Sequence, residues 1–492
     1  MSLANGTDQL AFLAFKARIT NDPFHVVSSW NDSVPYCKWP NILCGGHQHP
    51  NRVRALHLQS SGLVGSMTPE IGKLTFLCEI LLHNNSFHGE IRHEVSFRSR
   101  LRYLYLHNNT FQGEIPPNIT RCSNLRQISL GFNNLVGKFS VELGTLSKLQ
   151  FLAFHFNRLT GQIPPSVGNL SSLDTVSTAA NHLSGSIPNA LAQLKRLEYL
   201  TLAENKLSVT IPLGIYNLSS LIGFDVGVEQ LELGGNSLSG KVDIHFEGLS
   251  NLNWLSKYSN HLGSGGVDDL NFVDTLTNCS SLTFLDLSGN RFGGVFPNYI
   301  VNLSIQLTML FLSNNQISGE IPVGIGKFES LQSLGLYGNL LEGSIPTSIG
   351  RLQMLNQLKL YRNRFTGPIP SSFENLTLLI ELSLSENLLQ GKIPSSLAKC
   401  KYLLRLDLSS NSFSDIIPRE IFDFSTLIEL NLSRNSFFGF LPLQVGRLTN
   451  LGILDVFENI LCGEIPSTLG ICTSLEHLFM EVSLVLQHIL GD

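Results

Sequence analysis

The residues of this sequence best suited to recognising a ligand are aromatic side chains, with histidines and arginines beside them, that alternate with leucines. In a β-strand such alternation turns the leucines to one face and the intervening residues to the other. Exposed aromatic rings give stacking area, and a neighbouring arginine holds a carboxylate, so the set suits an extended peptide. Ordinary variation at solvent-facing positions is the alternative interpretation. The predicted ligand-binding residues are Tyr103, Tyr105, His107, Phe132, Phe151, His155, Phe156, Tyr337, Tyr361, Arg362 and Arg364.

Catalytic chemistry has no comparable set of residues. The sequence lacks a G-x-x-x-x-G-K-[ST] phosphate loop, an H-E-x-x-H site, a G-x-S-x-G turn and the protein-kinase signatures. Gly326 and Lys327 adjoin, but the upstream glycine and the following Ser or Thr are missing. The 14 histidines show no shared spacing. We therefore predict that the chain is not an enzyme and carries no cofactor or metal.

One unit of 24 residues, recurring along most of the chain, positions these side chains. One copy places Leu355, Leu358, Leu360, Asn363 and Phe365 in the order L-x-x-L-x-L-x-x-N-x-L, which is the leucine-rich-repeat spacing. The asparagine would end the strand and use its amide to satisfy backbone groups buried at the turn. Stacked copies would form a ladder of Asn85, Asn109, Asn133, Asn157, Asn181, Asn205, Asn236, Asn260, Asn290, Asn315, Asn339, Asn363, Asn387, Asn411, Asn435 and Asn459.

After the asparagine the unit continues as L-x-G-x-I-P, for example at 113–116 and 185–188. Glycine permits a tight turn, proline stops strand pairing, and a stretch such as 166–173 should form short helical turns. The predicted fold is an α/β repeat solenoid with a parallel concave sheet and short convex helices and turns. We expect an N-terminal cap at 1–50, about eighteen leucine-rich repeats at 51–480, and an aberrant tail at 481–492.

Two features resemble a known family. The L-x-G-x-I-P segment looks like the plant type of leucine-rich repeat. The block containing Trp30, Cys37, Trp39 and Cys44 is similar to the N-terminal cap of plant receptor-like kinases. The resemblance covers residues 5 to about 480. It is closest to the class that includes the plant receptors for bacterial flagellin and elongation factor Tu and the rice resistance receptor kinases, and it implies a right-handed superhelix with a second sheet.

The resemblance also implies a function. It suggests a ligand-recognition ectodomain in immune or developmental signalling, with a peptide or protein epitope as ligand and a shorter co-receptor kinase as partner. Its expected location is the extracellular face of the plasma membrane or the apoplast. A secreted leucine-rich-repeat inhibitor of microbial cell-wall-degrading enzymes is the main alternative, although that type usually has fewer coils and a C-terminal cysteine cap. A nonfunctional truncated receptor fragment is the third, since no polar cap closes the last coil.

The N-terminal block should form a short helix that begins at Thr7 or Asp8 and runs through Ile19. Its expected buried face carries Leu10, Leu13, Ala14 and Ala17.

The eight cysteines divide into sets. Cys37 and Cys44 are interpreted as a disulfide that seals the open end of the core, and the resemblance supports this pairing. The alternative is a metal site that adds His47 and His49, although this spacing fits no usual zinc pattern. Cys78 and Cys462 have no evident partner. Four others precede a strand's first leucine by three residues and should be small buried side chains: Cys122, Cys279, Cys400 and Cys472.

Two coils exceed 24 residues. Between Asn205 and Asn236 the strand is either Phe224-x-Val226 or Leu231-x-Leu233, and we favour the second because an asparagine follows it. Between Asn260 and Asn290, residues 263–278 should lengthen the convex segment as a fuller helix that starts near Asp268. Both are interpreted as tolerated insertions rather than ligand-contacting segments, because loops accept length at small entropic cost.

Charged residues are only 14 % and the net charge is −5 without a strong run of either sign, which argues against nucleic-acid binding. The N-terminus is too polar for a signal peptide, and no run of about twenty apolar residues would insert into a membrane. Glycans would hydrate a surface so poor in charge. The eleven Asn-x-Ser/Thr sequons are at Asn5, Asn31, Asn84, Asn108, Asn118, Asn169, Asn217, Asn278, Asn302, Asn375 and Asn431.

Overall fold

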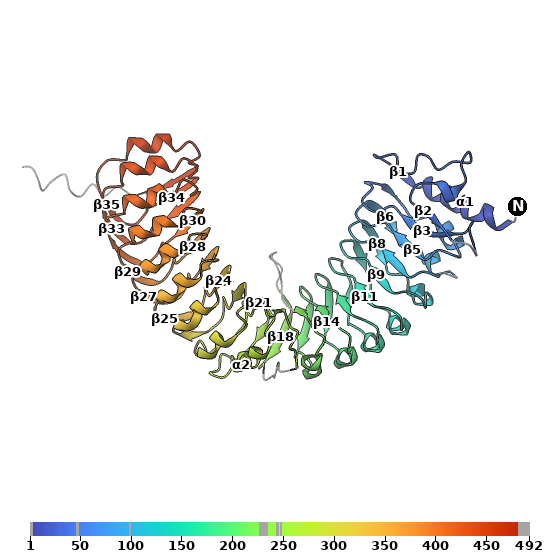
Figure 1. The fold of residues 1–492 in the computed structure, drawn as a ribbon, viewed down its shortest axis with the longest axis horizontal. Helices are drawn as coiled ribbons and strands as arrows, with labels where there is room; N and C mark the ends of the chain where they lie inside the picture. Colours follow the sequence, from blue (N-terminus) through green and yellow to red (C-terminus); the bar gives the residue numbers. More distant parts are fainter. Residues whose placement is uncertain are drawn as a thin grey trace, which may run out of the picture. The chain divides into compact units, whose positions relative to one another are not determined.

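A computed structural model describes residues 3–45, 49–97, 100–225, 235–242, 246 and 248–480. The chain divides into two compact units, unit 1 (Met1–Ser239) and unit 2 (Gly240–Asp492), each of which is described by itself. Both units repeat one coil, in which a short strand, a turn, a second short strand and a 3-10 turn follow one another (Figure 1). The predicted tail at 481–492 lies outside the described residues.

The first strand of each coil belongs to the concave sheet. Neighbouring strands pair in parallel, one repeat apart, so that Leu358 lies beside Leu382. At the N-terminal edge β2 (Ile42–Cys44) is antiparallel to β3. In unit 1 the sheet holds β3 (Val53–His57), β5 (Glu79–Leu81), β7 (Tyr103–Tyr105), β9 (Gln127–Ser129), β11 (Phe151–Ala153), β13 (Thr175–Ser177), β15 (Tyr199–Thr201) and β17 (Gly223–Asp225). In unit 2 it holds β19 (Trp254–Ser256), β21 (Phe284–Asp286), β22 (Met309–Phe311), β24 (Ser333–Gly335), β26 (Gln357–Lys359), β28 (Glu381–Ser383), β30 (Arg405–Asp407), β32 (Glu429–Asn431), β34 (Ile453–Asp455) and β36 (His477–Phe479).

The second strand of each coil follows the ladder asparagine and lies in a second set of parallel pairings. At its start β1 (Ile19–Asn21) is antiparallel to β4. In unit 1 these strands are β4 (Val64–Ser66), β6 (Ser86–Glu90), β8 (Thr110–Glu114), β10 (Asn134–Val136), β12 (Thr160–Gly161), β14 (His182–Gly185), β16 (Lys206–Val209) and β18 (Ser237–Gly240). In unit 2 they are β20 (His261–Leu262), β23 (Ser318–Gly319), β25 (Leu340–Ser344), β27 (Arg364–Gly367), β29 (Leu388–Gly391), β31 (Ser412–Asp415), β33 (Ser436–Gly439) and β35 (Ile460–Leu461).

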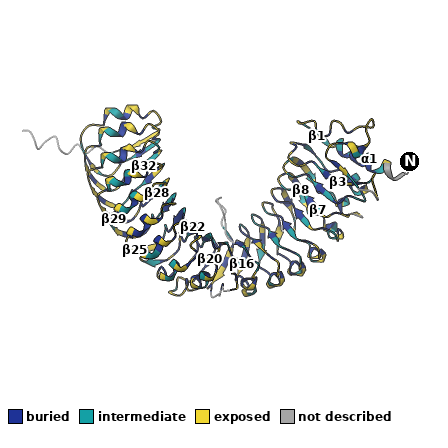
Figure 2. Ribbon diagram, in the orientation of Figure 1, coloured by how far each residue is buried: buried dark blue, intermediate teal, exposed yellow. Residues whose placement is uncertain are grey.

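Short 3-10 turns close each coil on the convex side. Examples are η6 (Pro165–Asn169) and η12 (Thr347–Arg351), each of which begins just after the proline of the I-P pair. Their central Val167 and Ile349 are buried, and buried residues follow the strands in each unit (Figure 2). The predicted parallel concave sheet, second sheet and short convex turns are thereby confirmed. None of the helices in the described ranges is long and apolar enough to cross a membrane.

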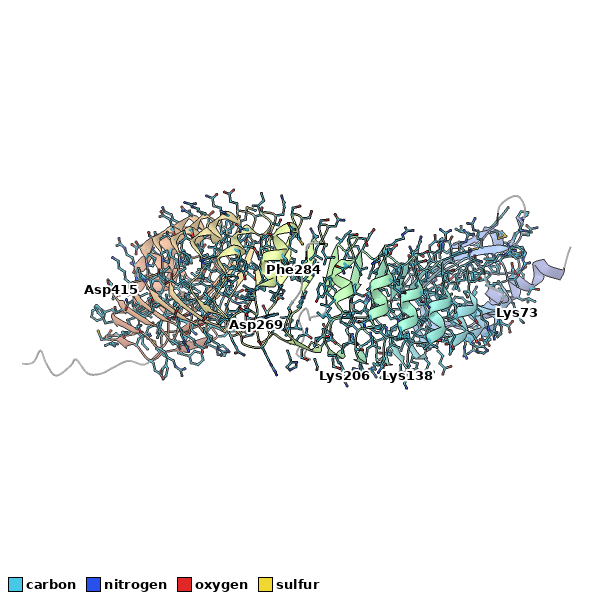
Figure 3. All side chains as sticks on the ribbon, turned by 90° about the horizontal axis from the view of Figure 1, so that it is seen from below. Lys73, Lys138, Lys206, Asp269, Phe284 and Asp415 are labelled. Atoms are coloured by element: carbon cyan, nitrogen blue, oxygen red, sulfur yellow. A yellow bond between two sulfur atoms is a disulfide. The ribbon has the colours of Figure 1, made fainter. Side chains whose placement is uncertain are left out.

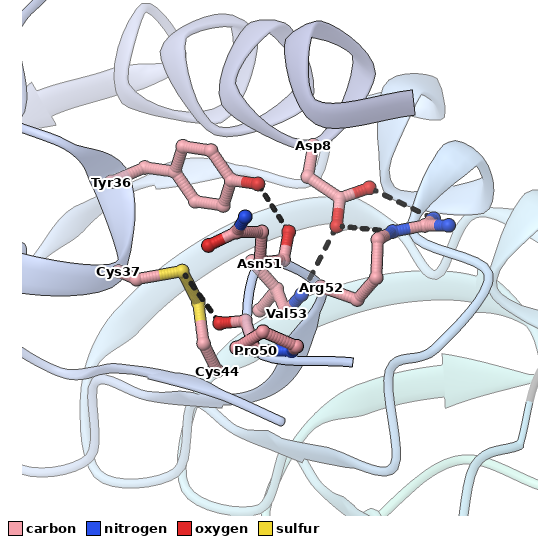
Figure 4. The surroundings of a disulfide bond; sticks show 8 residues. All are labelled: Asp8, Tyr36, Cys37, Cys44, Pro50, Asn51, Arg52 and Val53. Atoms are coloured by element: carbon pink, nitrogen blue, oxygen red, sulfur yellow. Dashed lines mark hydrogen bonds and ion pairs between the residues drawn. A yellow bond between two sulfur atoms is a disulfide. The ribbon is translucent and has the colours of Figure 1, made fainter. Parts of the chain in front are cut away.

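The N-terminal helix differs from the prediction. Helix α1 (Leu3–Lys16) begins before Asp8, so this residue lies inside the helix rather than at its cap. Asp8 is fully buried and accepts hydrogen bonds from Arg52 Nε (3.1 Å), Arg52 Nη2 (3.2 Å) and the Val53 amide (3.0 Å) (Figure 4). The predicted buried face was wrong, because Leu10 is 68 % exposed whereas Phe12 is buried. The helix therefore turns the carboxylate of Asp8, and not the side chain of Leu10, towards the first coil.

The predicted disulfide between Cys37 and Cys44 is confirmed (Figure 4). It removes both thiolates, so the alternative metal site is wrong; His47 lies outside the described residues. Beside the disulfide, the rings of Trp30 and Trp39 stack at 5.7 Å and complete the core of the cap. The four cysteines at equivalent positions are buried as predicted, while Cys78 is buried and Cys462 is half-buried.

In both long coils the elements differ from those predicted. Gly223–Asp225 (β17) is the strand that pairs with β15, so the preference for Leu231-x-Leu233 was wrong; that segment lies outside the described residues. Strand pairing in register with Tyr199–Thr201 outweighed the presence of a following asparagine. In the other long coil, α2 (Phe272–Thr275) begins later than the predicted Asp268, after a turn.

One core position breaks the repeat pattern. Lys257 occupies the inward site that leucine holds in most other coils and is fully buried. Its ammonium lies 4.8 Å from the centre of the Phe246 ring and 5.1 Å from that of Phe272, so two cation–π contacts partly replace its hydration. Burial lowers the pKa of Lys257 to about 7, because the charged form is costly in an apolar core.

Candidate ligand-binding surface

The asparagine ladder sets the edge of the concave sheet. Asn363 Nδ2 donates to the carbonyls of Leu336, Leu360 and Tyr361, and its Oδ1 accepts from the Leu341 amide at 3.0 Å. One side chain thus joins its own turn to the preceding coil. Equivalent donations to backbone carbonyls are made by Asn85, Asn109, Asn133, Asn157, Asn181, Asn205, Asn236, Asn260, Asn290, Asn315, Asn339, Asn387, Asn411, Asn435 and Asn459.

In unit 1 the strand β7 presents aromatic residues on the concave sheet. Tyr103 and Tyr105 flank the buried Leu104 and are half-buried, and the Tyr105 hydroxyl donates to Gln127 Oε1. His107 follows the strand and stacks on His83 with ring centres 4.5 Å apart. The sequence prediction missed His83, although its position 24 residues before His107 was a usable signal.

His155 lies in the same column of concave positions as His83 and His107. Its ring extends over Gly131, where a β-carbon would come within 2.6 Å of His155 Nε2. The Nδ1 atoms of His107 and His155 are hydrogen-bonded to the hydroxyls of Ser129 (2.9 Å) and Ser177 (3.0 Å). The structure therefore gathers three imidazoles, from coils two, three and five of the repeat, into one row.

This histidine row is uncharged at neutral pH. Burial, and then the charges of His83 and His155, lowers the pKa of His107 to about 4. Burial also lowers the pKa values of His83 and His155. The row consequently behaves as aromatic surface with polar edges rather than as a cationic patch.

Phe132 and Phe156 stand beside this row at a turn position that has a positive φ in most coils. Each precedes a ladder asparagine with a φ of 52° and 51°, in the left-handed region that bulky residues rarely adopt. Their rings stack with centres 4.4 Å apart, and Phe132 also meets His155 edge to face at 5.3 Å. They remain 49 % and 42 % exposed. Unit 1 thus brings together the predicted Tyr103, Tyr105, His107, Phe132, Phe151, His155 and Phe156 on one sheet face.

The four remaining predicted residues lie in unit 2, on two surfaces. Tyr337 and Tyr361 stack with ring centres 4.3 Å apart on the concave side. Arg362 is not a free anchor, because its Nε bonds to both carboxylate oxygens of Glu386 at 3.0 and 3.1 Å. Arg364 begins β27 in the second sheet, and no ion pair of its side chain is present among the described residues. The side chain of Arg362 is therefore held within the protein, whereas Arg364 belongs to the neighbouring strand of the second sheet.

A groove of about 1040 Å³ in unit 2 takes in both arginines and extends along the ladder edge of the concave sheet. Its lining combines serine hydroxyls, ladder asparagines and charged side chains of both signs. The residues are Arg362, Asn363, Arg364, Ser385, Glu386, Asn387, Leu388, Asp407, Ser409, Ser410, Asn431, Ser433, Arg434, Asp455 and Phe457.

An aromatic cluster at the start of unit 2 was missed by the sequence prediction. Trp254 and Phe284 approach with ring centres 4.7 Å apart, and Phe284 meets Phe311 at 6.0 Å (Phe284 is labelled in Figure 3). The signal was present, since all three adjoin an inward leucine of a concave strand. The ring of Phe311 lies over Gly335, whose missing side chain makes room for it.

The sequons fall on different surfaces. Asn169, Asn217, Asn278, Asn302 and Asn375 share one place, the exposed last residue of a convex 3-10 turn. Asn118 lies in another such turn, η4 (Pro117–Arg121). Asn84, Asn108 and Asn431 instead lie on the concave side, where Asn108 Nδ2 donates to Asn84 Oδ1 at 3.1 Å. Glycosylation of all these asparagines stays a prediction.

Comparison with known families identifies two elements of the chain. The family model described as the leucine rich repeat N-terminal domain matches residues 5–45. The family model described as the leucine rich repeat matches residues 100–122, 148–170, 281–303, 306–328, 330–352, 354–376, 378–400 and 402–424.

Individual relatives point to receptor kinases. The LRR receptor-like serine/threonine-protein kinase EFR of Arabidopsis thaliana is 48 % identical over 88 residues, which are 18 % of this chain and 8 % of that protein. The ectodomain of the plant membrane receptor kinase GASSHO1/SCHENGEN3 from Arabidopsis thaliana, solved in complex with CASPARIAN STRIP INTEGRITY FACTOR 2, is 32 % identical with a TM-score of 0.85. That similarity covers 96 % of this chain and 59 % of the other.

The plant peptide hormone receptor RGFR1, solved in complex with RGF2, is 33 % identical with a TM-score of 0.72. The similarity covers 87 % of this chain and 70 % of the receptor chain. The cap, the repeats and these relatives agree: the chain belongs to the family of leucine-rich-repeat ectodomains found in plant receptor kinases.

Proposed function

We propose that this chain recognises a peptide, or an extended epitope of a protein, on its concave sheet, as the ligand-sensing part of a receptor kinase. The carrying observation is the exposed stack of Phe132 and Phe156 beside the neutral histidine row. Rigid aromatic rings next to hydrogen-bonding groups are the side chains that dominate binding energy at protein interfaces.

The backbone conformation of both phenylalanines is common to the repeat, because the residue before the ladder asparagine has a positive φ in most coils, including Ala180, Glu204 and Glu386. Asparagine tolerates this conformation better than a bulky residue does. The positive φ therefore belongs to the turn, and the proposed role in binding rests on the stacking and exposure of the two rings.

The relatives support a peptide as ligand class, because RGFR1 is described as a peptide hormone receptor. Three further features follow from the family resemblance alone and are part of this proposal: a co-receptor kinase as partner, an extracellular location, and a role in immune or developmental signalling. Arg362 is engaged by Glu386, so it is not the anchor for a ligand carboxylate in this proposal.

A displayed random-peptide library selected on the purified chain tests the proposal. The affinity of an enriched peptide is then measured by fluorescence anisotropy with the wild type and with Phe132→Asn and Phe156→Asn. Each substitution should weaken binding about tenfold or more, as loss of a central aromatic anchor does. The melting temperature should stay unchanged or rise, because asparagine tolerates the positive φ.

Phe438→Asn is the matched control, since it removes a ring of similar exposure (47 %) that lies in β33 of the second sheet. It should leave the affinity unchanged. A library that enriches no peptide, or peptides that bind both concave variants as tightly as the wild type, would refute the proposal.

A further inference from the structure

At one concave position of successive coils in unit 2, aromatic side chains are interrupted by three serines. These residues stand two positions before successive ladder asparagines: Tyr337, Tyr361, Ser385, Ser409, Ser433 and Phe457. The first two rings are stacked and nearly parallel, with an interplanar angle of 8°. For three coils serines then replace the rings, until Phe457 provides another that is 38 % exposed.

The three serines form the floor of the groove described above. Ser385, Ser409 and Ser433 all line it, and Phe457 lines its far end. Their side chains are short, so the space that Tyr337 and Tyr361 fill in their own coils is left to the groove here. The space above Ser385 lies one coil after the Tyr361 ring. The space above Ser433 lies one coil before the Phe457 ring.

Most charged side chains along this groove have partners within the protein. Arg362 is bound to Glu386, and Arg434 Nε lies 3.1 Å from Glu458 Oε2. Asp407 accepts hydrogen bonds from the amide and hydroxyl of Ser409 at 3.1 and 2.7 Å. Both an anionic and a cationic ligand would meet like charges as often as opposite ones, so the groove favours a neutral ligand.

The distance between neighbouring coils favours one backbone conformation of a bound peptide. Neighbouring parallel strands are about 4.8 Å apart, so the places above Ser385 and Ser433, two coils apart, are separated by roughly 9.6 Å. In a polyproline II helix, with about 3.1 Å rise and three residues per turn, side chains i and i+3 share one side at roughly 9.3 Å. In an extended strand the side chains on one face are about 6.7 Å apart, which matches neither one coil nor two.

We propose that this groove binds a neutral, proline-rich peptide segment in the polyproline II conformation, whose ring-bearing residues i and i+3 stack on Tyr361 and Phe457. The inference rests on the proposed function, because it names the ligand class of the concave sheet in unit 2. A polyproline II backbone has no internal hydrogen bonds. The Ser385 hydroxyl lines the groove and can donate to one of the carbonyls that such a backbone leaves free, whereas the hydroxyls of Ser409 and Ser433 already donate to Asp407 and Asn431.

The test uses the full chain and two labelled probes with blocked termini: decaproline and a glycine–serine peptide of equal length. Decaproline should bind saturably and at least about tenfold more tightly than the flexible probe, which lacks both the rings and the preformed helix. Ser385→Phe and Ser433→Phe, which fill the two places, should each weaken decaproline binding by about tenfold. Tyr361→Ala should weaken it by about three- to tenfold, the value of one ring contact.

Ser436→Phe is the matched control, because it adds the same ring at an exposed position of β33 in the second sheet. Rings are already accommodated at the column position in neighbouring coils, so the groove variants should keep the wild-type melting temperature. Equal binding of both probes, no saturable binding of decaproline, or unchanged binding by Ser385→Phe would overturn the proposal.

The two proposals fail separately. Library-selected peptides that depend on Phe132 but bind Ser385→Phe normally would leave the proposed function standing and overturn the polyproline site. Decaproline binding that is lost in Ser385→Phe, with no peptide dependent on Phe132, would support the groove and refute the role of the phenylalanine stack.

Discussion

Asn363→Ala tests whether the ladder holds the coils together. The substitution removes the acceptor of the Leu341 amide and the donor to the carbonyls of Leu336 and Leu360, all of them in the interior of the coil stack. Leaving such groups without a partner costs about 1–3 kcal/mol in total, because the carbonyls keep other lone pairs while the amide has only one proton to donate. In a solenoid this loss is local to neighbouring coils.

Hydrogen–deuterium exchange followed by mass spectrometry measures the effect where it arises. The peptide that contains Leu341 should lose protection by a factor of about 5 to 150, corresponding to that free energy. Asn450→Ala is the control, since it removes a single exposed hydrogen bond to the Ser425 carbonyl at 2.8 Å. Its effect should stay within about 0.5 kcal/mol. If Leu341 exchanged in Asn363→Ala as slowly as in the control, the ladder would not carry the stability assigned to it.

Three further perturbations probe the core, the cap and the cysteines. The folded chain releases the Lys257 proton near pH 7, whereas the unfolded chain keeps it to about pH 10. Between these pH values the unfolded state binds more protons, so the free energy of unfolding rises with pH. Urea unfolding should therefore show the wild type ~4 kcal/mol more stable at pH 10 than at pH 7, a difference absent in Lys257→Met; identical pH profiles would contradict the assignment. Asp8→Asn should lower the free energy of unfolding by ~3 kcal/mol, since it leaves Arg52 beside a neutral buried partner; a thermal melt like that of the wild type would show that the cap does not depend on this pair. A thiol reagent should label half-buried Cys462 first and Cys400 slowly, because burial raises the pKa of Cys400 to about 11; peptide mapping that finds both labelled at one rate would exclude this order.

The departures from the sequence prediction share a cause. Asp8 was assigned to a helix cap from its neighbours in the chain, but its partner Arg52 is 44 residues away. Arg362 was predicted as an anchor for a ligand carboxylate, whereas Glu386 comes beside it from the next coil. Gly223–Asp225 became the strand through pairing with β15, despite the better local match downstream. In each case a contact across coils outweighed a local pattern.

The groove in unit 2 shows the same limit for function. Ser385, Ser409 and Ser433 are unremarkable in sequence, and only their alignment in successive coils, between Tyr361 and Phe457, makes them the floor of the groove for which we propose a ligand. The unit 1 cluster was more accessible, because Tyr103, Tyr105 and His107 adjoin in the chain as well as in space.

By itself the sequence determined the coil: leucines two residues apart, an asparagine three residues later and a following glycine specify strand, turn and second strand. These features depend on residues within one repeat, and each repeat contacts mainly its neighbours, so the pattern is sufficient to specify them. The tertiary structure decided which side chains of different coils meet. Stacking at about 4.8 Å brings together residues 24 or more apart, and it pairs Arg362 with Glu386, stacks Phe132 on Phe156 and opens the groove above the serines.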